Sequence, residues 1–169
     1  MLLSYRAMNV VDAVNARLSV RQFLSTPVSD DQLRSLLADA SRSPSGGNVQ
    51  PWRIYVVNGE SLTRMREFLT TQAPAEAPEY DVYPKSITEP YRTNRFTIGE
   101  QMYATLGIAR EDKPGRLRQF ANNNDFFSAP AAMFCFIDRQ MGPPQWSDLG
   151  MFLQTFMLLA VENGLATCA

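Results

Sequence analysis

Residues 44–52 read Pro-Ser-Gly-Gly-Asn-Val-Gln-Pro-Trp and lead into the apolar stretch Ile-Tyr-Val-Val at 54–57. Proline and glycine punctuate residues 43–51 and predict a loop, whereas aromatic and β-branched residues over 52–57 predict a strand. Two adjacent glycines let a backbone approach a flat ligand closely, and the Asn48 and Gln50 amides suit the edge of a heteroaromatic ring. The glycine spacing matches neither a P-loop nor the G-x-G-x-x-G fingerprint of dinucleotide-binding loops. The alternative is an ordinary polar turn before a strand.

Helices are predicted on both sides of this loop. Asn9 is placed to cap a first helix, and Ser29 with Gln32 forms a capping-box pattern that starts a second helix ending near Ser41. Apolar periodicity predicts further helices over 61–72, 96–106, 114–122 and 145–163, a continuous apolar strand buried on both faces over 129–137, and the beginning of another strand over 165–169. The proline-containing stretch 73–90 is expected to be an extended excursion. The pattern predicts one α+β domain spanning 1–169.

Composition excludes several classes of function. Sixteen basic and seventeen acidic residues give a net charge of −1, which argues against a broad surface for nucleic acid or anionic lipid. The chain has no histidine, so Ser-His-Asp triads, Cys-His dyads and His-ligated metal sites are excluded. Two cysteines are too few for a disulfide scaffold and predict a reducing cytoplasm. The apolar stretch 150–161 is too short to span a bilayer and predicts a buried helix.

A second polar cluster lies just beyond the first predicted helix. Arg17, Ser19 and Arg21 place two guanidinium groups and a hydroxyl within five residues. Arginine presents a planar fork of donors that matches phosphate oxygens, so the cluster suits a phosphate clamp. The alternative is a solvated helix end, where cations also complement the helix dipole. Taken alone, the cluster favours this alternative.

Together the two segments resemble the N-terminal signature of the flavin-dependent nitroreductase family. The signature consists of Arg-x-Ser-x-Arg at 17–21 and Ser-Pro-Ser-Gly-Gly-Asn-x-Gln-Pro-Trp at 43–52. The resemblance also covers Trp-Ser-Asp-Leu-Gly at 146–150 and Glu-Asn-Gly-Leu at 162–165. In motif form the chain is similar to members that act on nitroaromatic acids such as nitrobenzoate. The resemblance implies a central, mostly antiparallel sheet flanked by helices, in a homodimer that holds FMN at the subunit interface.

The resemblance also implies the site residues and the reaction. Arg17, Ser19 and Arg21 match positions that hold the ribityl phosphate and the pyrimidine side of the flavin, with Arg21 expected near N1 and C2=O. The loop residues Pro44, Ser45, Gly46 and Asn48 match positions along the isoalloxazine, partly from the other subunit. No side chain need act as a nucleophile, because the flavin carries the chemistry. NAD(P)H is the implied electron donor, and a small nitroaromatic or quinone-type compound is the acceptor in a ping-pong cycle.

The resemblance departs at the end of the chain. Family members are generally about fifty residues longer, roughly a quarter more than this chain. The chain is therefore expected to lack three features: the segment that faces flavin N5, a final basic contact to the phosphate, and a tail that packs on the partner subunit. Two alternatives stay open: a non-catalytic or impaired flavin-binding remnant, and a flavin enzyme of the same fold with other chemistry, such as dehalogenation or flavin destruction. The sequence does not decide between NADH and NADPH, nor does it fix the physiological acceptor.

Overall fold

The computed structural model describes residues 8–72, 76–78 and 81–169. The chain divides into two compact units, each treated by itself below. The first unit comprises the described residues up to Met65 together with Phe127–Ala169, and the second comprises the described residues of Arg66–Phe126. Six α-helices and a two-stranded antiparallel sheet lie within the described residues, which confirms the α+β class.

The first two helices begin at side-chain caps. Asn9 caps α1 (Val10–Ala16), its Oδ1 accepting a hydrogen bond of 2.9 Å from the Asp12 N–H. Ser29 caps α2 (Asp30–Ala40), its Oγ accepting a hydrogen bond of 3.2 Å from the Gln32 N–H. These bonds satisfy backbone donors that the first helical turn leaves without an internal partner. The Ser29 signal therefore predicted the start of α2 correctly.

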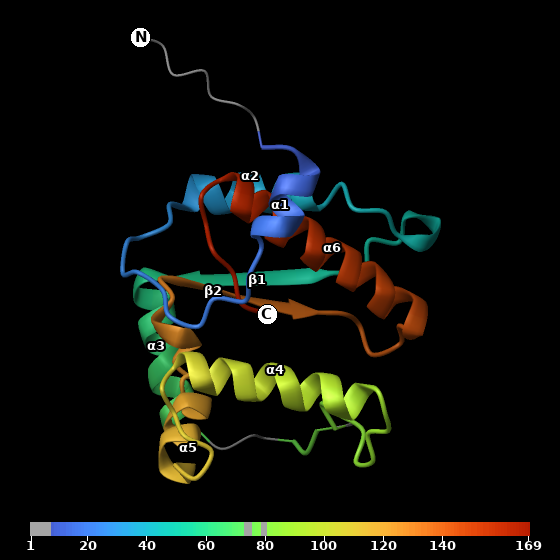
Figure 1. Cartoon of the computed structure of the whole chain (residues 1–169). Helices are drawn as coiled ribbons and strands as arrows, with labels where there is room; N and C mark the ends of the chain where they lie inside the picture. The colour runs from blue at the N-terminus through green and yellow to red at the C-terminus, as the bar shows by residue number, and fades with distance from the viewer. Residues whose placement is uncertain (1–7, 73–75, 79–80) are drawn as a thin grey trace. The chain divides into compact units, whose positions relative to one another are not determined.

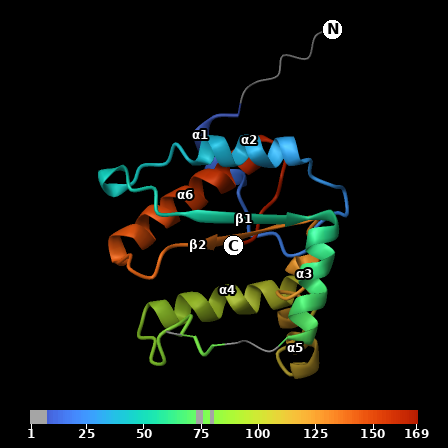
Figure 2. The same ribbon diagram turned by 180° about the vertical axis from the view of Figure 1, so that it is seen from behind.

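The sheet pairs β1 (Arg53–Asn58) with β2 (Ala131–Phe136), and Arg53 lies opposite Phe136 in the antiparallel register. Ile54 and Cys135, which are cross-strand partners, pack against the core on one face. Neighbouring positions point the other way, and there the rings of Tyr55 and Phe136 meet edge to face with centroids 5.7 Å apart. Figure 1 and Figure 2 show α1, α2 and α6 together on one side of this sheet.

The core of the first unit forms between the sheet and the longest helix, α6 (Pro143–Glu162). Phe152 is 1% exposed and stacks on Trp52 with ring centroids 5.1 Å apart. Ala40 from α2 and Leu149 from α6 complete the buried cluster. Trp52 directly follows the loop over residues 43–51, called the Pro-Gly loop below, and it packs on the apolar stripe of α6. This contact fixes the end of the loop against the helix.

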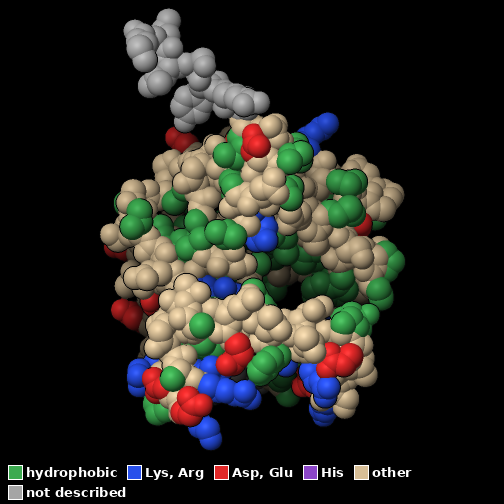
Figure 3. Space-filling model, in the orientation of Figure 1, with side chains coloured by type: hydrophobic (Ala, Val, Ile, Leu, Met, Phe, Trp, Pro, Cys, Tyr) green, Lys and Arg blue, Asp and Glu red, His purple; other side chains and the backbone are tan. Residues whose placement is uncertain are grey.

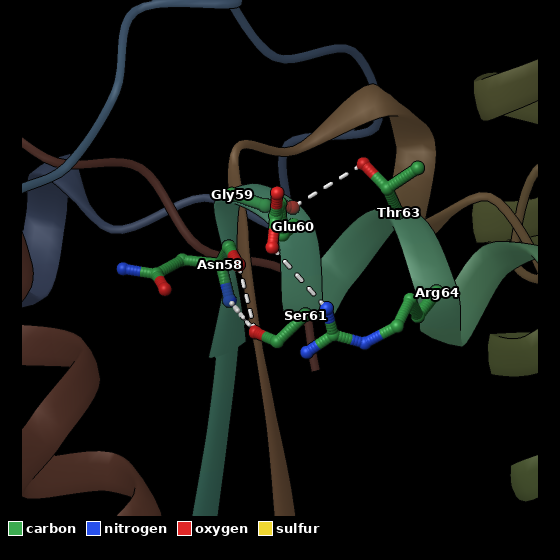
Figure 4. A network of polar contacts seen from close by, with 6 residues as sticks. All are labelled: Asn58, Gly59, Glu60, Ser61, Thr63 and Arg64. Atoms are coloured by element: carbon green, nitrogen blue, oxygen red, sulfur yellow. Dashed lines mark hydrogen bonds and ion pairs between the residues drawn. The ribbon is translucent and has the colours of Figure 1, made fainter.

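A polar network starts α3 (Gly59–Thr71) directly after β1 (Figure 4). The Ser61 hydroxyl accepts a hydrogen bond of 2.9 Å from the Asn58 N–H and donates one of 2.7 Å to the Asn58 carbonyl. Glu60 pairs with Arg64 one turn later at 3.3 Å. Gly59 takes a φ of 47°, which turns the chain from strand into helix without a side-chain clash.

The second unit is built on α4 (Tyr91–Thr105) and α5 (Lys113–Ala121). Arg116 of α5 donates to both carboxylate oxygens of Glu100 of α4, at 2.6 and 3.1 Å, and its guanidinium lies 4.1 Å from the centre of the Tyr103 ring. The hydrogen bond from Arg116 lowers the pKa of Glu100. Figure 3 shows charged side chains of both signs gathered over these helices.

Some predicted boundaries are wrong. The helix predicted over 96–106 begins at Tyr91, because Glu89 accepts a hydrogen bond of 3.2 Å from the Thr93 N–H and supports an earlier turn that lacks apolar periodicity. The predicted strand over 165–169 is only a single parallel bridge from Thr167 to Ser19. The strand predicted to be buried on both faces is half-buried, with Phe136 52% exposed. Part of the predicted excursion, at residues 73–75 and 79–80, lies outside the described residues.

Among the helices described, none combines the length and the apolar character needed to cross a membrane.

Candidate functional site

The Arg17–Arg21 segment leaves α1 in an extended conformation. Arg17 is the C-cap residue, and its N–H donates to the Ala13 carbonyl at 3.0 Å. Two residues later Ser19 forms a parallel bridge with Thr167, supported by a hydrogen bond of 3.0 Å from the Val20 N–H to the Thr167 carbonyl. Residues from the two ends of the sequence are thus held side by side, and the bridge fixes where the polar cluster lies.

The two guanidinium groups of this segment are available to an anion. Arg17 is half-buried, whereas Ser19 and Arg21 are exposed. Arg21 donates a long hydrogen bond of 3.4 Å to the Ser19 carbonyl. In the part of the chain that the structure describes, neither arginine forms an ion pair, so both charges remain uncompensated by protein carboxylates. Such a donor set suits phosphate oxygens.

The Pro-Gly loop contains the short 3₁₀ turn η1 (Gly46–Asn48), and its backbone is unusual. Gly47, Asn48 and Gln50 all adopt positive φ, at 58°, 55° and 49°. The Ser45 hydroxyl accepts a hydrogen bond of 2.9 Å from the Gln50 N–H, and the Gln50 amide donates to Asn48 Oδ1 at 3.1 Å. Internal hydrogen bonds therefore hold a conformation that non-glycine residues rarely adopt, a feature that clusters at functional sites.

The loop also leaves room beside its backbone. A Cβ placed on Gly46 would meet no heavy atom within 4 Å. Pro44, Gly46 and Asn48 are exposed, while Ser45 is half-buried. A flat group can therefore approach Gly46 without displacing a side chain of this chain.

Asp148 anchors the loop to α6, a contact that sequence reasoning missed. Asp148 is only 5% exposed, and its Oδ2 accepts a hydrogen bond of 3.3 Å from the Gly46 N–H. The two residues are 102 positions apart in the sequence. The motif at 146–150 contained this residue, but no local pattern pairs it with the loop.

The two predicted clusters are not brought together within one chain. No hydrogen bond or ion pair joins segment 17–21 to loop 44–50 among the described residues. In Figure 1 the loop lies where β1 begins and α6 starts, whereas segment 17–21 runs beside residues 165–168. Both clusters are largely exposed, since only Arg17 in the first and Ser45 in the second are half-buried among the predicted site residues.

The titratable groups near the sheet do not form a nucleophilic centre. Burial raises the pKa of the Cys135 thiol, so little reactive thiolate forms at neutral pH. Within the described ranges, no group of three or more His, Cys, Asp or Glu side chains could hold a metal ion. The donors of Arg17 and Arg21 suit an anionic group, and the open backbone at Gly46 suits a planar one.

Comparisons of the sequence with known proteins agree on one family. A model of the nitroreductase family matches residues 14–169. Nitrobenzene nitroreductase of Ectopseudomonas oleovorans is 37% identical over 166 residues, covering 93% of this chain and 71% of the relative. A 4-nitrobenzoate reductase of Pseudomonas putida is 37% identical over 160 residues, covering 93% of this chain and 70% of the relative.

Comparison with solved structures points to the same family. The FMN and NADPH-dependent nitroreductase NfnB from Sphigopyxis sp. strain HMH has a TM-score of 0.89 and 45% sequence identity, over 95% of this chain and 74% of that one.

Proposed function

Since the chain belongs to the nitroreductase family, we propose that it is an FMN-dependent oxidoreductase that passes electrons from NADPH or NADH to a nitroaromatic or quinone-type acceptor. The chain is homologous to FMN- and NADPH-dependent nitroreductases. The observation that carries the proposal is the organised loop 44–50, because it joins an open Gly46 backbone to fixed polar groups. The proposed cellular location is the cytoplasm, supported by the free thiols of Cys135 and Cys168.

The residues present fit FMN. Arg17, Ser19 and Arg21 would hold the ribityl phosphate and the pyrimidine side, since the two cations carry no protein counter-charge within the described residues. Pro44, Ser45, Gly46 and Asn48 would lie along the isoalloxazine, where the absent side chain at Gly46 leaves space for a ring. Bound FMN supplies the redox chemistry, accepting a hydride and passing electrons on.

The protein's own contribution is binding, orientation and charge. The Asp148 carboxylate holds the Gly46 N–H and so fixes the loop against α6. A guanidinium on the pyrimidine side, which we assign to Arg21, stabilises negative charge that develops on reduction. No protein nucleophile takes part in this scheme.

The site is completed by a second copy of the chain. The two clusters lie at different places in one chain, and a site that uses both therefore draws one cluster from each subunit. Three valines of α1 are exposed: Val10 is 72%, Val11 66% and Val14 49% exposed. Exposed apolar side chains of this kind are typical of an interface, which supports a homodimer.

Steady-state kinetics tests the proposed reaction. Initial rates of NADPH and NADH oxidation are measured at several fixed concentrations of 4-nitrobenzoate or a quinone. A ping-pong cycle gives parallel lines in double-reciprocal plots, because donor and acceptor react in separate half-reactions. Intersecting lines would overturn the ping-pong scheme. A protein that binds FMN yet oxidises neither nucleotide would support the impaired remnant, and loss of halide from a halogenated aromatic would point to other chemistry on the same fold.

A further inference from the structure

An open cavity of about 720 Å³ lies in the second unit, between residues 84–87 and α4. Its volume falls in the range of roughly 300–1,000 Å³ that small-molecule sites occupy. Three side chains that line it are cationic: Lys85, Arg92 and Arg95. One carboxylate, Glu100, also lines it.

The charges of the cavity do not cancel. Glu100 accepts hydrogen bonds of 2.6 and 3.1 Å from Arg116, which does not line the cavity, so the Glu100 charge is already matched. Arg92 is paired with Glu89 at 2.6 Å. Lys85 and Arg95 form no ion pair among the residues that the structure describes. The cavity therefore carries a net positive charge.

Arg95 is held in a pose that suits an oxyanion. Its guanidinium carbon lies 4.0 Å from the centre of the Tyr83 ring. Stacking on an aromatic ring uses the flat face of the guanidinium, whereas hydrogen bonds form at its edge. Arg95 forms no ion pair among the described residues, so its fork of donors can serve a carboxylate or a phosphate.

The wall beside these cations is apolar. Phe96 and Ile87 both line the cavity, and Phe96 is 51% exposed. The Arg110 guanidinium lies 5.3 Å from the centre of the Phe96 ring. Because Phe96 lines the same cavity as Lys85 and Arg95, an aromatic ligand held there can contact the Phe96 ring with its anionic group toward these cations.

We infer that this cavity binds an aromatic ligand through an attached oxyanion, either the carboxylate of an acidic acceptor or the phosphate of the nucleotide donor. The inference rests on the proposed function for the identity of these ligands. Specificity among these ligands is set by the positive charges of Lys85 and Arg95 and by contact of the ligand ring with Phe96.

Titration calorimetry on the purified full chain tests the inference with paired probes. One pair is 4-nitrobenzoate and nitrobenzene, and the other is adenosine 2′-phosphate and adenosine. In at least one pair the charged member should bind at least tenfold more tightly, and this preference should shrink as salt is raised, because the cations are exposed. The pair that shows the preference identifies the source of the oxyanion. No preference in either pair would overturn the inference.

Variants locate the effect. Combining Lys85→Ala with Arg95→Ala should abolish the preference for the charged probe, and Arg95→Lys should retain part of it. Lys113→Ala combined with Arg118→Ala is the matched control, because it likewise removes two exposed positive charges, here from α5 outside the cavity. A double variant that keeps the wild-type preference would overturn the inference. FMN content is measured on the same preparations, so failure of the proposed function is seen separately from failure of anion binding.

Discussion

Replacing Gly46 with valine separates the stability of the fold from the binding of the flavin. Gly46 is exposed, and a Cβ at this position would meet no heavy atom within 4 Å. Its N–H, which donates to Asp148, is retained in the variant. The folded chain should therefore accept the valine, whereas a flavin ring lying on the loop should not.

The two expected magnitudes differ enough to be resolved. A glycine replaced without strain changes stability mainly through the unfolded chain, so the free energy of unfolding should stay within about 1 kcal/mol of wild type. A side chain inserted between the loop and the ring should weaken FMN binding at least tenfold, or about 1.4 kcal/mol. Gly47→Val is the informative contrast, since φ is 58° there and a side chain adds about 1–2 kcal/mol of strain.

Urea unfolding followed by circular dichroism gives the stability of each variant, and quenching of FMN fluorescence during titration gives the affinity. Gly46→Val should unfold like wild type and bind FMN weakly. Wild-type affinity in this variant would refute the placement of the loop against the flavin. A loss of more than about 2 kcal/mol of stability would instead refute the open space beside Gly46.

Three further predictions concern the phosphate contact, the core and the second unit. Arg17→Ala should weaken FMN binding by about 1.5–3 kcal/mol through loss of a charge-assisted contact, whereas Arg34→Ala, an exposed charge on α2, should not; equal affinities would remove Arg17 from the site. Phe152→Ala should lower the free energy of unfolding by about 3–5 kcal/mol in urea, because this ring is 1% exposed and stacked; a change below 1 kcal/mol would contradict the core assignment. The pKa of Glu100 is lowered by the hydrogen bond from Arg116, so its stabilising effect is present above the unfolded carboxyl pKa and is lost as pH falls through the lower folded pKa. When helicity is followed by circular dichroism as pH is lowered, Glu100→Gln should lack the share of the helix loss that comes from protonation of Glu100. An unchanged acid profile would count against the Glu100–Arg116 ion pair.

Local signals predicted most of the fold. Ser29 and Gln32 marked the start of α2, because a capping hydroxyl acts within one turn of backbone. The strand β1 followed from its β-branched and aromatic residues. By contrast, α4 begins at Tyr91, in a polar turn supported by Glu89, where apolar periodicity gave no signal. The last predicted strand fails for a different reason: Thr167 finds only Ser19 as a ladder partner within the described residues.

The candidate site was predicted as two sequence clusters, and the structure adds what links them to the fold. The Gly46 N–H reaches Asp148, and Ser19 lies beside Thr167. Both contacts join positions more than one hundred residues apart, and no single-sequence pattern encodes such a pairing. The assignments of Arg17, Ser19, Arg21 and the loop residues to the flavin stay predictions.

The absorption spectrum of the freshly purified chain tests the central claim most directly. We expect a flavin spectrum, and heat should release FMN at a ratio near one per subunit. A colourless protein that also fails to take up added FMN would contradict the proposed function and leave the family relationship without the flavin chemistry.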